Sequence, residues 1–214
     1  MSAPPTQRLR PAHWVALGGW GALCAWCVGG FPPCVDLPAH GAQLQTLAGL
    51  VRGDDAVSAL YEVRPSIGYG LPYWLFLPAA LGVDGAFAAR VAMGLALFLT
   101  VVSVASLLRA LGRPVWAAVL AAPTAFGFTY WYGLVPAFFA QPMLLFACAA
   151  FARAQRAEHP RRWWVLCGVA ATATLLSHVV VFAALAVALV AWALAENPRR
   201  WLPPTAGALL VPCL

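Results

Sequence analysis

The chain has 214 residues, of which 63% are hydrophobic and only 9% are charged. Because soluble domains carry about 25% charged residues, this composition excludes a soluble globular domain. The repeated apolar stretches, each near the roughly 20 residues that a bilayer core needs, predict an all-α bundle of transmembrane helices. The formal net charge of +6 does not indicate nucleic-acid binding, since the arginines stand at the ends of apolar segments, where basic residues orient membrane helices.

The N-terminal region predicts a first membrane span. Residues 1–13 are polar and contain Arg8 and Arg10, and residues 14–34 are apolar throughout. No small-residue cleavage site follows, so we expect an uncleaved transmembrane helix rather than a signal peptide. The two arginines before it predict that the N-terminus is cytoplasmic.

Residues 35–90 are predicted to form an extracytoplasmic loop that begins with an amphipathic helix. Apolar side chains recur in this loop at helical spacing, between Gly41 and Gly53. They are Leu44, Leu47, Leu50 and Val51. Such a pattern is typical of a short helix that lies along a membrane surface.

The second apolar segment of this loop, residues 67–82, is not predicted to cross the membrane. It is short, and glycines and prolines interrupt it. If it crossed, the arginine-rich loops that follow would lie outside, against the tendency of basic residues to stay in the cytoplasm. We therefore expect this segment to be re-entrant or to lie at the surface.

Residues 91–200 are predicted to form the transmembrane bundle, which brings the total to about six spans. The predicted spans are 91–108, 114–132, 134–152 and the two halves of 163–195, which meet near His178. Residues 201–214 begin a further apolar segment that would reach only about 21 Å as a helix. We interpret them as the start of a truncated seventh span, so the chain is expected to be a fragment of a longer protein.

The distribution of charge supports this topology. Ten of the thirteen arginines fall on the cytoplasmic side: Arg8, Arg10, Arg109, Arg113, Arg153, Arg156, Arg161, Arg162, Arg199 and Arg200. Five of the seven acidic residues fall outside: Asp36, Asp54, Asp55, Glu62 and Asp84. All basic residues are arginine, in a chain rich in alanine and tryptophan, which suggests a bacterial genome of high GC content. The predicted location is therefore a bacterial inner (plasma) membrane.

The strongest candidate site is Asp36-Leu-Pro-Ala-His40, directly after the first span. If these residues start a helix, Asp36 and His40 lie one turn apart on one face. Such a pair can act as a general base that also orients a hydroxyl or a phosphate. The alternative is structural, with Asp36 capping the helix and His40 at the surface.

Further polar residues of the same loop are weaker candidates for substrate binding. Asp54 and Asp55 follow Gly53, where a turn with a helix cap is the simpler interpretation. Glu62 and Arg64 precede Pro65, and an arginine there can hold a phosphate or reach toward the membrane interface. The alternative for Asp54 and Asp55 is an acidic group for a divalent metal or a sugar hydroxyl. No zinc-ligand pattern occurs among the six cysteines, and no cofactor is predicted.

His178 stands inside an apolar run, where an ionisable residue is by default a functional candidate. The predicted topology brings it to the outer side, where Asp36 also lies. The alternative is a neutral histidine that is hydrogen-bonded to a neighbouring helix.

The order of these features resembles the GT-C superfamily of membrane glycosyltransferases. The matching residues are Asp36-Leu-Pro-Ala-His40, Gly-Leu-Pro-Tyr-Trp-Leu-Phe-Leu at 70–77, Phe87-Ala-Ala-Arg90-Val91, and Leu-Leu-Ser-His ending at His178. The resemblance is one of topology and covers most of residues 14–195.

This resemblance implies transfer of a sugar from a polyprenyl-phosphate-linked donor to an acceptor outside the cytoplasm. It implies that Asp36 takes the proton from the acceptor hydroxyl, with His40 beside it. Arg64 or His178 would then meet the donor phosphate, and Asp54, Asp55 and Glu62 would complete the substrate site. Leu37 stands where the family often has a second acid. The implied partners are the lipid bilayer and the lipid-linked donor, and the oligomeric state is not specified.

A competing hypothesis is a non-catalytic polytopic membrane protein, such as a transporter segment or a subunit of a cell-envelope complex. A transporter predicts an internal repeat and ionisable residues in mid-span. The sequence shows no clear repeat, and only His178 comes close to a mid-span position.

Overall fold

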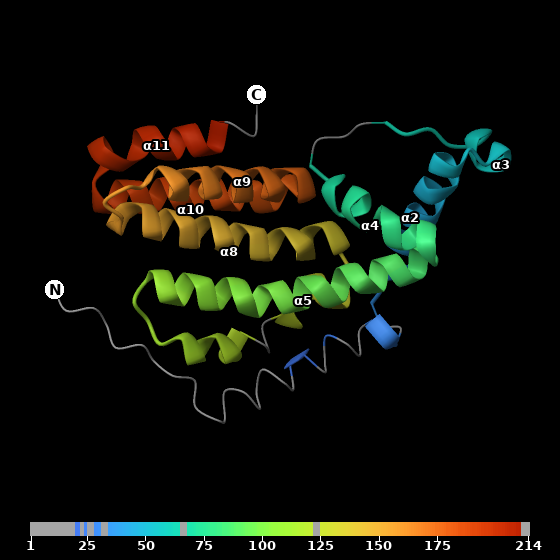
Figure 1. Ribbon diagram of the computed structural model, residues 1–214, viewed down its shortest axis with the longest axis horizontal. Helices are drawn as coiled ribbons and strands as arrows, with labels where there is room; N and C mark the ends of the chain where they lie inside the picture. Colours follow the sequence, from blue (N-terminus) through green and yellow to red (C-terminus); the bar gives the residue numbers. More distant parts are fainter. Residues whose placement is uncertain are drawn as a thin grey trace.

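The computed structural model describes residues 20, 21, 24, 28–30, 34–64, 68–121 and 125–210, and all regular secondary structure in these ranges is helical (Figure 1). Within these described ranges, three helices are long and apolar enough to cross a membrane: α5 (Gly85–Ala110), α8 (Val135–Arg156) and α10 (Val179–Glu196). The predicted all-α class is confirmed, whereas six spans with a partial seventh stay a prediction. The expectations for residues 1–13, for most of 14–34 and for 211–214 lie outside the described residues.

The long helices lie side by side in one bundle, together with α9 (Arg161–Ser177) and α11 (Pro198–Leu210) (Figure 1). Helix α8 packs against α5, α9 and α10 and buries Phe138 and Phe151 completely. Its contacts contain many alanines, and small residues let membrane helices approach closely. Helix α10 instead exposes apolar side chains such as Val180 and Val187, as expected of a surface that faces lipid.

The arginine-rich segments gather at one end of this bundle. Arg153 donates hydrogen bonds to the hydroxyl of Ser106 at 3.1 Å and to its carbonyl oxygen at 3.0 Å. Arg156 donates to the carbonyl oxygen of Ala110 at 2.6 Å. The end of α8 is thus tied to the end of α5, which places the 109–113 and 153–162 clusters together, as the charge pattern predicts.

The apolar run 163–195 divides at His178, as predicted from the sequence. Helix α9 ends at Ser177, and α10 begins at Val179. His178 is extended, with φ −161° and ψ 112°, and its Nδ1 accepts a hydrogen bond from the Val181 N–H at 3.4 Å. The imidazole therefore caps α10, which explains why a polar residue interrupts the run.

The segment 114–132 differs from the single helical span expected from its composition. The structure has a 3₁₀ helix, η1 (Val115–Ala121), and a four-residue helix, α7 (Phe128–Trp131). Residues 122–124 between them are not among the described residues. Pro123 and Gly127 stand between the two helices in the sequence, and neither favours a continuous helix. Apolar composition alone did not reveal this break.

The predicted amphipathic helix is present as α2 (Leu37–Arg52). It ends, as expected, at Gly53, whose left-handed φ of 73° is typical of a glycine that stops a helix. Its most deeply buried side chains are Leu37, Leu44 and Ala48, whereas Val51 is exposed. The face that packs on the protein therefore includes Leu44 from the predicted stripe, but it extends toward Leu37 and Ala48 and leaves Val51 outside.

The segment 67–82 contains a short helix, α4 (Leu71–Gly82), with Pro78 inside it. Twelve residues rise about 18 Å, well short of the roughly 30 Å hydrocarbon core. This length agrees with the prediction that the segment does not cross the membrane. Arg52 at the end of α2 donates to the carbonyl oxygen of Leu81 at 2.5 Å and so joins the C-terminal ends of α2 and α4.

Helix α2 crosses the start of α5 at two glycines. A Cβ atom at Gly85 would lie 2.1 Å from the carbonyl oxygen of Gly41, so only glycine permits this approach. The side chain of Gln45 accepts a hydrogen bond from the Gly85 N–H at 2.8 Å, and Asp84 caps α5 through the Phe87 N–H. Helix α5 consequently begins six residues before the predicted span at 91.

Candidate functional site

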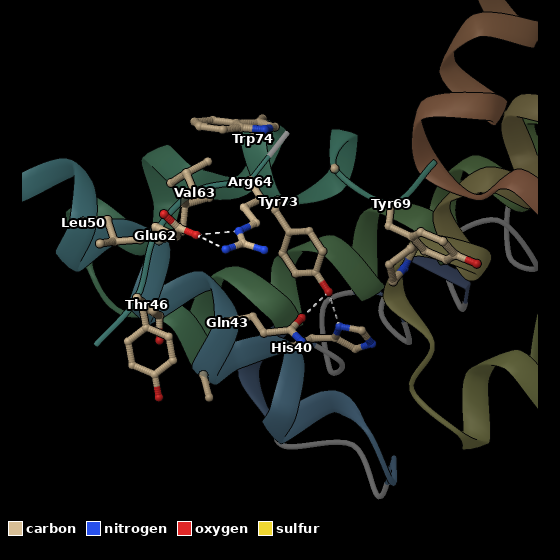
Figure 2. Close-up of a pocket in the computed structure, with 15 residues that line it drawn as sticks. His40, Gln43, Thr46, Leu50, Glu62, Val63, Arg64, Tyr69, Tyr73 and Trp74 are labelled. Carbon is tan, nitrogen blue, oxygen red and sulfur yellow. Dashed lines mark hydrogen bonds and ion pairs between the residues drawn. The ribbon is translucent and has the colours of Figure 1, made fainter. Parts of the chain in front are cut away.

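A cleft of about 830 Å³ lies beside α2 at the end of the bundle where α5 and α8 begin. Its walls come from α2, from residues 61–64 and from residues 69–74. Most of its lining is apolar or aromatic, including Leu50, Val63 and Trp74. Its polar lining residues include His40, Gln43, Thr46, Glu62, Arg64 and Tyr73. Figure 2 shows His40, Gln43 and Tyr73 meeting near the Glu62–Arg64 pair.

Three of these side chains form a hydrogen-bonded chain that joins α2 to α4 (Figure 2). The Oε1 atom of Gln43 can only accept, so the Tyr73 hydroxyl donates to it. The same hydroxyl oxygen then accepts from His40, whose Nδ1 lies 2.5 Å away. Because Gln43 follows His40 by three residues, both side chains lie on the same face of α2.

These two hydrogen bonds determine which nitrogen of His40 carries the proton. With Nδ1–H donating to Tyr73, Nε2 of the neutral ring has a lone pair. This atom is buried and has no hydrogen-bond partner among the described residues. Burial lowers the pKa of His40, although its contact with Gln43 and the negative charge of Asp36 act in the opposite direction. Burial also raises the pKa of Tyr73 to about 12. At neutral pH the pair is therefore uncharged, and His40 can accept a proton or a hydrogen bond at Nε2.

Asp36 lies at the start of α2, one turn before His40, as the sequence predicts. Its carbonyl oxygen accepts from the His40 N–H at 3.1 Å, and its own N–H donates to the carbonyl oxygen of Tyr132 at 2.7 Å. The half-buried carboxylate does not cap the helix, in contrast to the structural alternative. It neither lines the cleft nor hydrogen-bonds to the imidazole, so Asp36 and His40 are neighbours on one face rather than a bonded pair.

Glu62 and Arg64 lie together at the rim of the cleft and form an ion pair. Their side chains are 68% and 86% exposed, respectively, so water screens the pair and its contribution to stability is small. A pair this exposed can open at little cost, which leaves the guanidinium available to an anion.

Asp54 and Asp55 do not line the cleft. Oδ1 of Asp54 accepts hydrogen bonds from the N–H groups of Ala56 at 3.0 Å and Val57 at 3.3 Å. It thereby caps the short helix α3 (Asp55–Ser58), in which Asp55 is exposed. The structure thus agrees with the simpler interpretation of Asp54 and Asp55, a turn with a helix cap.

His178 does not line the cleft itself but contacts Tyr69, which does. Its ring packs edge-on against Tyr69, with centroids 4.9 Å apart, and Tyr69 lines the cleft. Burial lowers the pKa of His178 as well. The structure thus brings Asp36, His40 and His178 to the same end of the molecule, with His178 behind the wall of the cleft.

The sequence did not single out Gln43, Tyr69 or Tyr73 as site residues. Gln43 carries a detectable signal, since it stands one turn after His40. Tyr73 does not, because its contact with His40 joins residues 33 positions apart and depends on how α4 packs on α2. Among the described residues, no three His, Cys, Asp or Glu side chains lie close enough together to hold a metal ion.

Comparisons of the chain with protein-family models, with curated proteins and with solved structures found no match. Its function is therefore inferred from the sequence and from the geometry of the cleft.

Proposed function

We propose that the chain is a multi-pass protein of a bacterial inner membrane, with its N-terminus in the cytoplasm and the cleft on the opposite side. Three helices of suitable length and hydropathy support placement in a membrane. The arginine clusters of α5, α8 and α9 support the orientation, because basic residues are enriched in cytoplasmic loops. The cleft end contains Asp36, Glu62 and Asp84, in keeping with an outer surface.

Within this topology, we propose that the chain acts as a GT-C-like glycosyltransferase. It transfers a sugar from a polyprenyl-phosphate-linked donor to an extracytoplasmic acceptor. The observation that carries this proposal is an apolar and aromatic cleft that His40 lines, with Asp36 one helical turn before His40 and outside the lining. A lipid-linked substrate requires both features: apolar walls near the bilayer and a base in contact with water.

Each candidate residue has a role in this proposal. Asp36 takes the proton of the acceptor hydroxyl as that oxygen attacks the sugar; the bond from the sugar to the phosphate oxygen breaks, and the polyprenyl phosphate leaves with the bonding electrons. His40 fixes the Tyr73 hydroxyl at the wall of the cleft through its Nδ1 hydrogen bond, and so positions a polar group that can contact the substrate. Arg64 leaves Glu62 to hold the donor phosphate. His178 positions Tyr69, and Asp54 and Asp55 have no direct role.

One observation favours a second function. Asp36 does not line the cleft, and His40 is already bonded to Tyr73, so the cleft fits a binding site without catalysis equally well. In that case the chain is a non-catalytic subunit of a cell-envelope complex, which holds a lipid-linked ligand without transforming it.

The test compares sugar transfer by three proteins expressed in membranes from the whole gene: wild type, Asp36→Asn and Asp55→Asn. Asp55→Asn is the matched control, because it removes the same charge from an exposed residue of the same loop that does not line the cleft. We expect Asp36→Asn to slow transfer from a polyprenyl-linked donor about 100-fold or more, as loss of a general base does. Asp55→Asn should retain the wild-type rate.

Two results would speak against the proposal. Equal transfer by wild type and Asp36→Asn would exclude Asp36 as the base. Absence of transfer by the wild type, in membranes where the protein is present and folded, would favour the non-catalytic function.

A further inference from the structure

A second hollow lies at the arginine-rich end of the bundle, away from the cleft. It is a groove of about 790 Å³ between α9 and α11. Small residues form much of its wall: Gly168 and Thr172 from α9, and Pro204, Gly207 and Ala208 from α11. Figure 1 shows α11 lying beside α9, and both helices begin at the arginine-rich end.

The two glycines keep this groove open. Among the described residues, a Cβ atom at Gly207 would meet nothing within 4 Å, and one at Gly168 would meet only the carbonyl oxygen of Ala208 at 3.8 Å. From Arg161 to Thr172 the helix rises about 17 Å, so the groove follows α9 from its start into the apolar part of the bundle. This shape suits an extended hydrocarbon chain.

The mouth of the groove has a positive charge. Arg161 lines both this groove and an adjoining hollow that also contains Arg162, and Glu158 is the acid that lines the hollow. The side chain of Arg161 is exposed and forms no hydrogen bond or ion pair with other described residues. By contrast, the guanidinium of Arg162 lies over the ring of Trp163, 4.8 Å from its centroid. Arg161 is thus available to an external anion.

Trp164 lines the groove close to this charge. Tryptophan is enriched where a membrane helix passes from hydrocarbon to head groups. The groove therefore has the three parts of a phospholipid site in order: a cation, an interfacial aromatic ring and an apolar channel.

We propose that this groove binds an anionic phospholipid, with the phosphate at Arg161 and one acyl chain between α9 and α11. The charge complementarity selects an anionic lipid over a neutral one. The arginine-rich end faces the cytoplasmic leaflet in the proposed topology, and anionic lipids that bind basic pockets between membrane helices are concentrated there. This inference depends on the orientation of the chain and not on its enzymatic activity.

The test uses purified protein in non-ionic detergent, titrated with dioleoylphosphatidylglycerol or dioleoylphosphatidylcholine. Binding is followed by native mass spectrometry and by the shift in melting temperature. We expect the wild type to prefer phosphatidylglycerol and Arg161→Gln to bind it about fivefold more weakly. Arg113→Gln is the matched control, since it removes an exposed arginine at the same end of the bundle that does not line the groove.

A second variant tests the channel. Gly207→Leu projects a side chain into open space, so it should fold, retain its melting temperature without lipid and lose binding of phosphatidylglycerol. The proposal is overturned if the wild type does not distinguish the two lipids, or if Arg161→Gln and Arg113→Gln bind phosphatidylglycerol equally. It is also overturned if inorganic phosphate raises the melting temperature as much as the lipid does, because the site would then need no acyl chain.

Discussion

Tyr73 is the residue through which α4 contacts the polar face of α2. Its hydroxyl lies between His40 and Gln43, and the side chain is half-buried. We expect Tyr73→Phe to lower the free energy of unfolding by about 1 kcal/mol, because two polar groups lose their partner at once. Thermal melting in detergent measures the effect. Tyr61→Phe is the control, since Tyr61 lines the same cleft but is exposed, and equal melting of the two variants would contradict the hydrogen-bonded chain.

His40 should make the stability of the protein depend on pH. Burial lowers its pKa below the usual 6.5, so the unfolded chain binds the proton more readily than the folded one. The stability due to neutral His40 is therefore fully present above about pH 6.5 and is lost as the pH falls below that value. We expect the melting temperature to fall less between about pH 7.5 and pH 5.5 in His40→Gln than in wild type. An equal fall would assign the dependence to other groups, such as His178.

The close crossing of α2 and α5 should make Gly85 intolerant of any side chain. A Cβ atom there would lie 2.1 Å from the Gly41 carbonyl oxygen and 2.6 Å from the Gln45 nitrogen, both backbone atoms. We expect Gly85→Ala to cost about 3 kcal/mol through overpacking. Gly82→Ala is the control, because a Cβ atom at Gly82 meets no described residue within 4 Å. If both variants expressed and melted like wild type, the crossing would be looser than described.

The elements that the sequence predicted correctly are those with a local signal. The 41–53 helix has a glycine at its end, the 67–82 segment has internal prolines, and the 163–195 run has one polar residue at its break. The prediction of a single span over 114–132 was wrong, because a hydrophobic composition does not distinguish a continuous span from two short helices. The start of α5 was missed because its cap, Asp84, precedes the apolar stretch by several residues.

The part of the candidate site that could be predicted is also the part with a local sequence signal. Asp36 and His40 are one turn apart, and helical spacing alone places them on one face. Their surroundings could not be predicted, because Tyr73 and Tyr69 reach the site through tertiary packing of α4 and of the 68–70 segment. For the Gly-Asp-Asp sequence at 53–55, the simpler interpretation was a turn with a helix cap, and Asp54 forms this cap in the structure.

At the scale of the whole molecule, the two proposed sites lie at opposite ends of one helical bundle. The cleft that His40 lines lies at one end, together with Asp36, and the arginines with the α9–α11 groove lie at the other. Both proposals require that the arginine end faces the cytoplasm. The sequence could predict that the arginines lie at one end, because the basic residues of each loop favour the cytoplasmic side of the membrane. It could not predict either hollow, since each lies between helices that are distant in the sequence.

The orientation of the bundle is therefore the claim to test first. Single cysteines are introduced as Asp55→Cys and Glu158→Cys, both at exposed positions, in a background without the native cysteines. Intact cells are then treated with a membrane-impermeant thiol reagent, before and after permeabilisation. We predict that the cysteine at position 55 is labelled from outside and that the one at 158 is labelled only after permeabilisation. Labelling at 158 in intact cells would contradict the proposed orientation, and with it an outward-facing cleft.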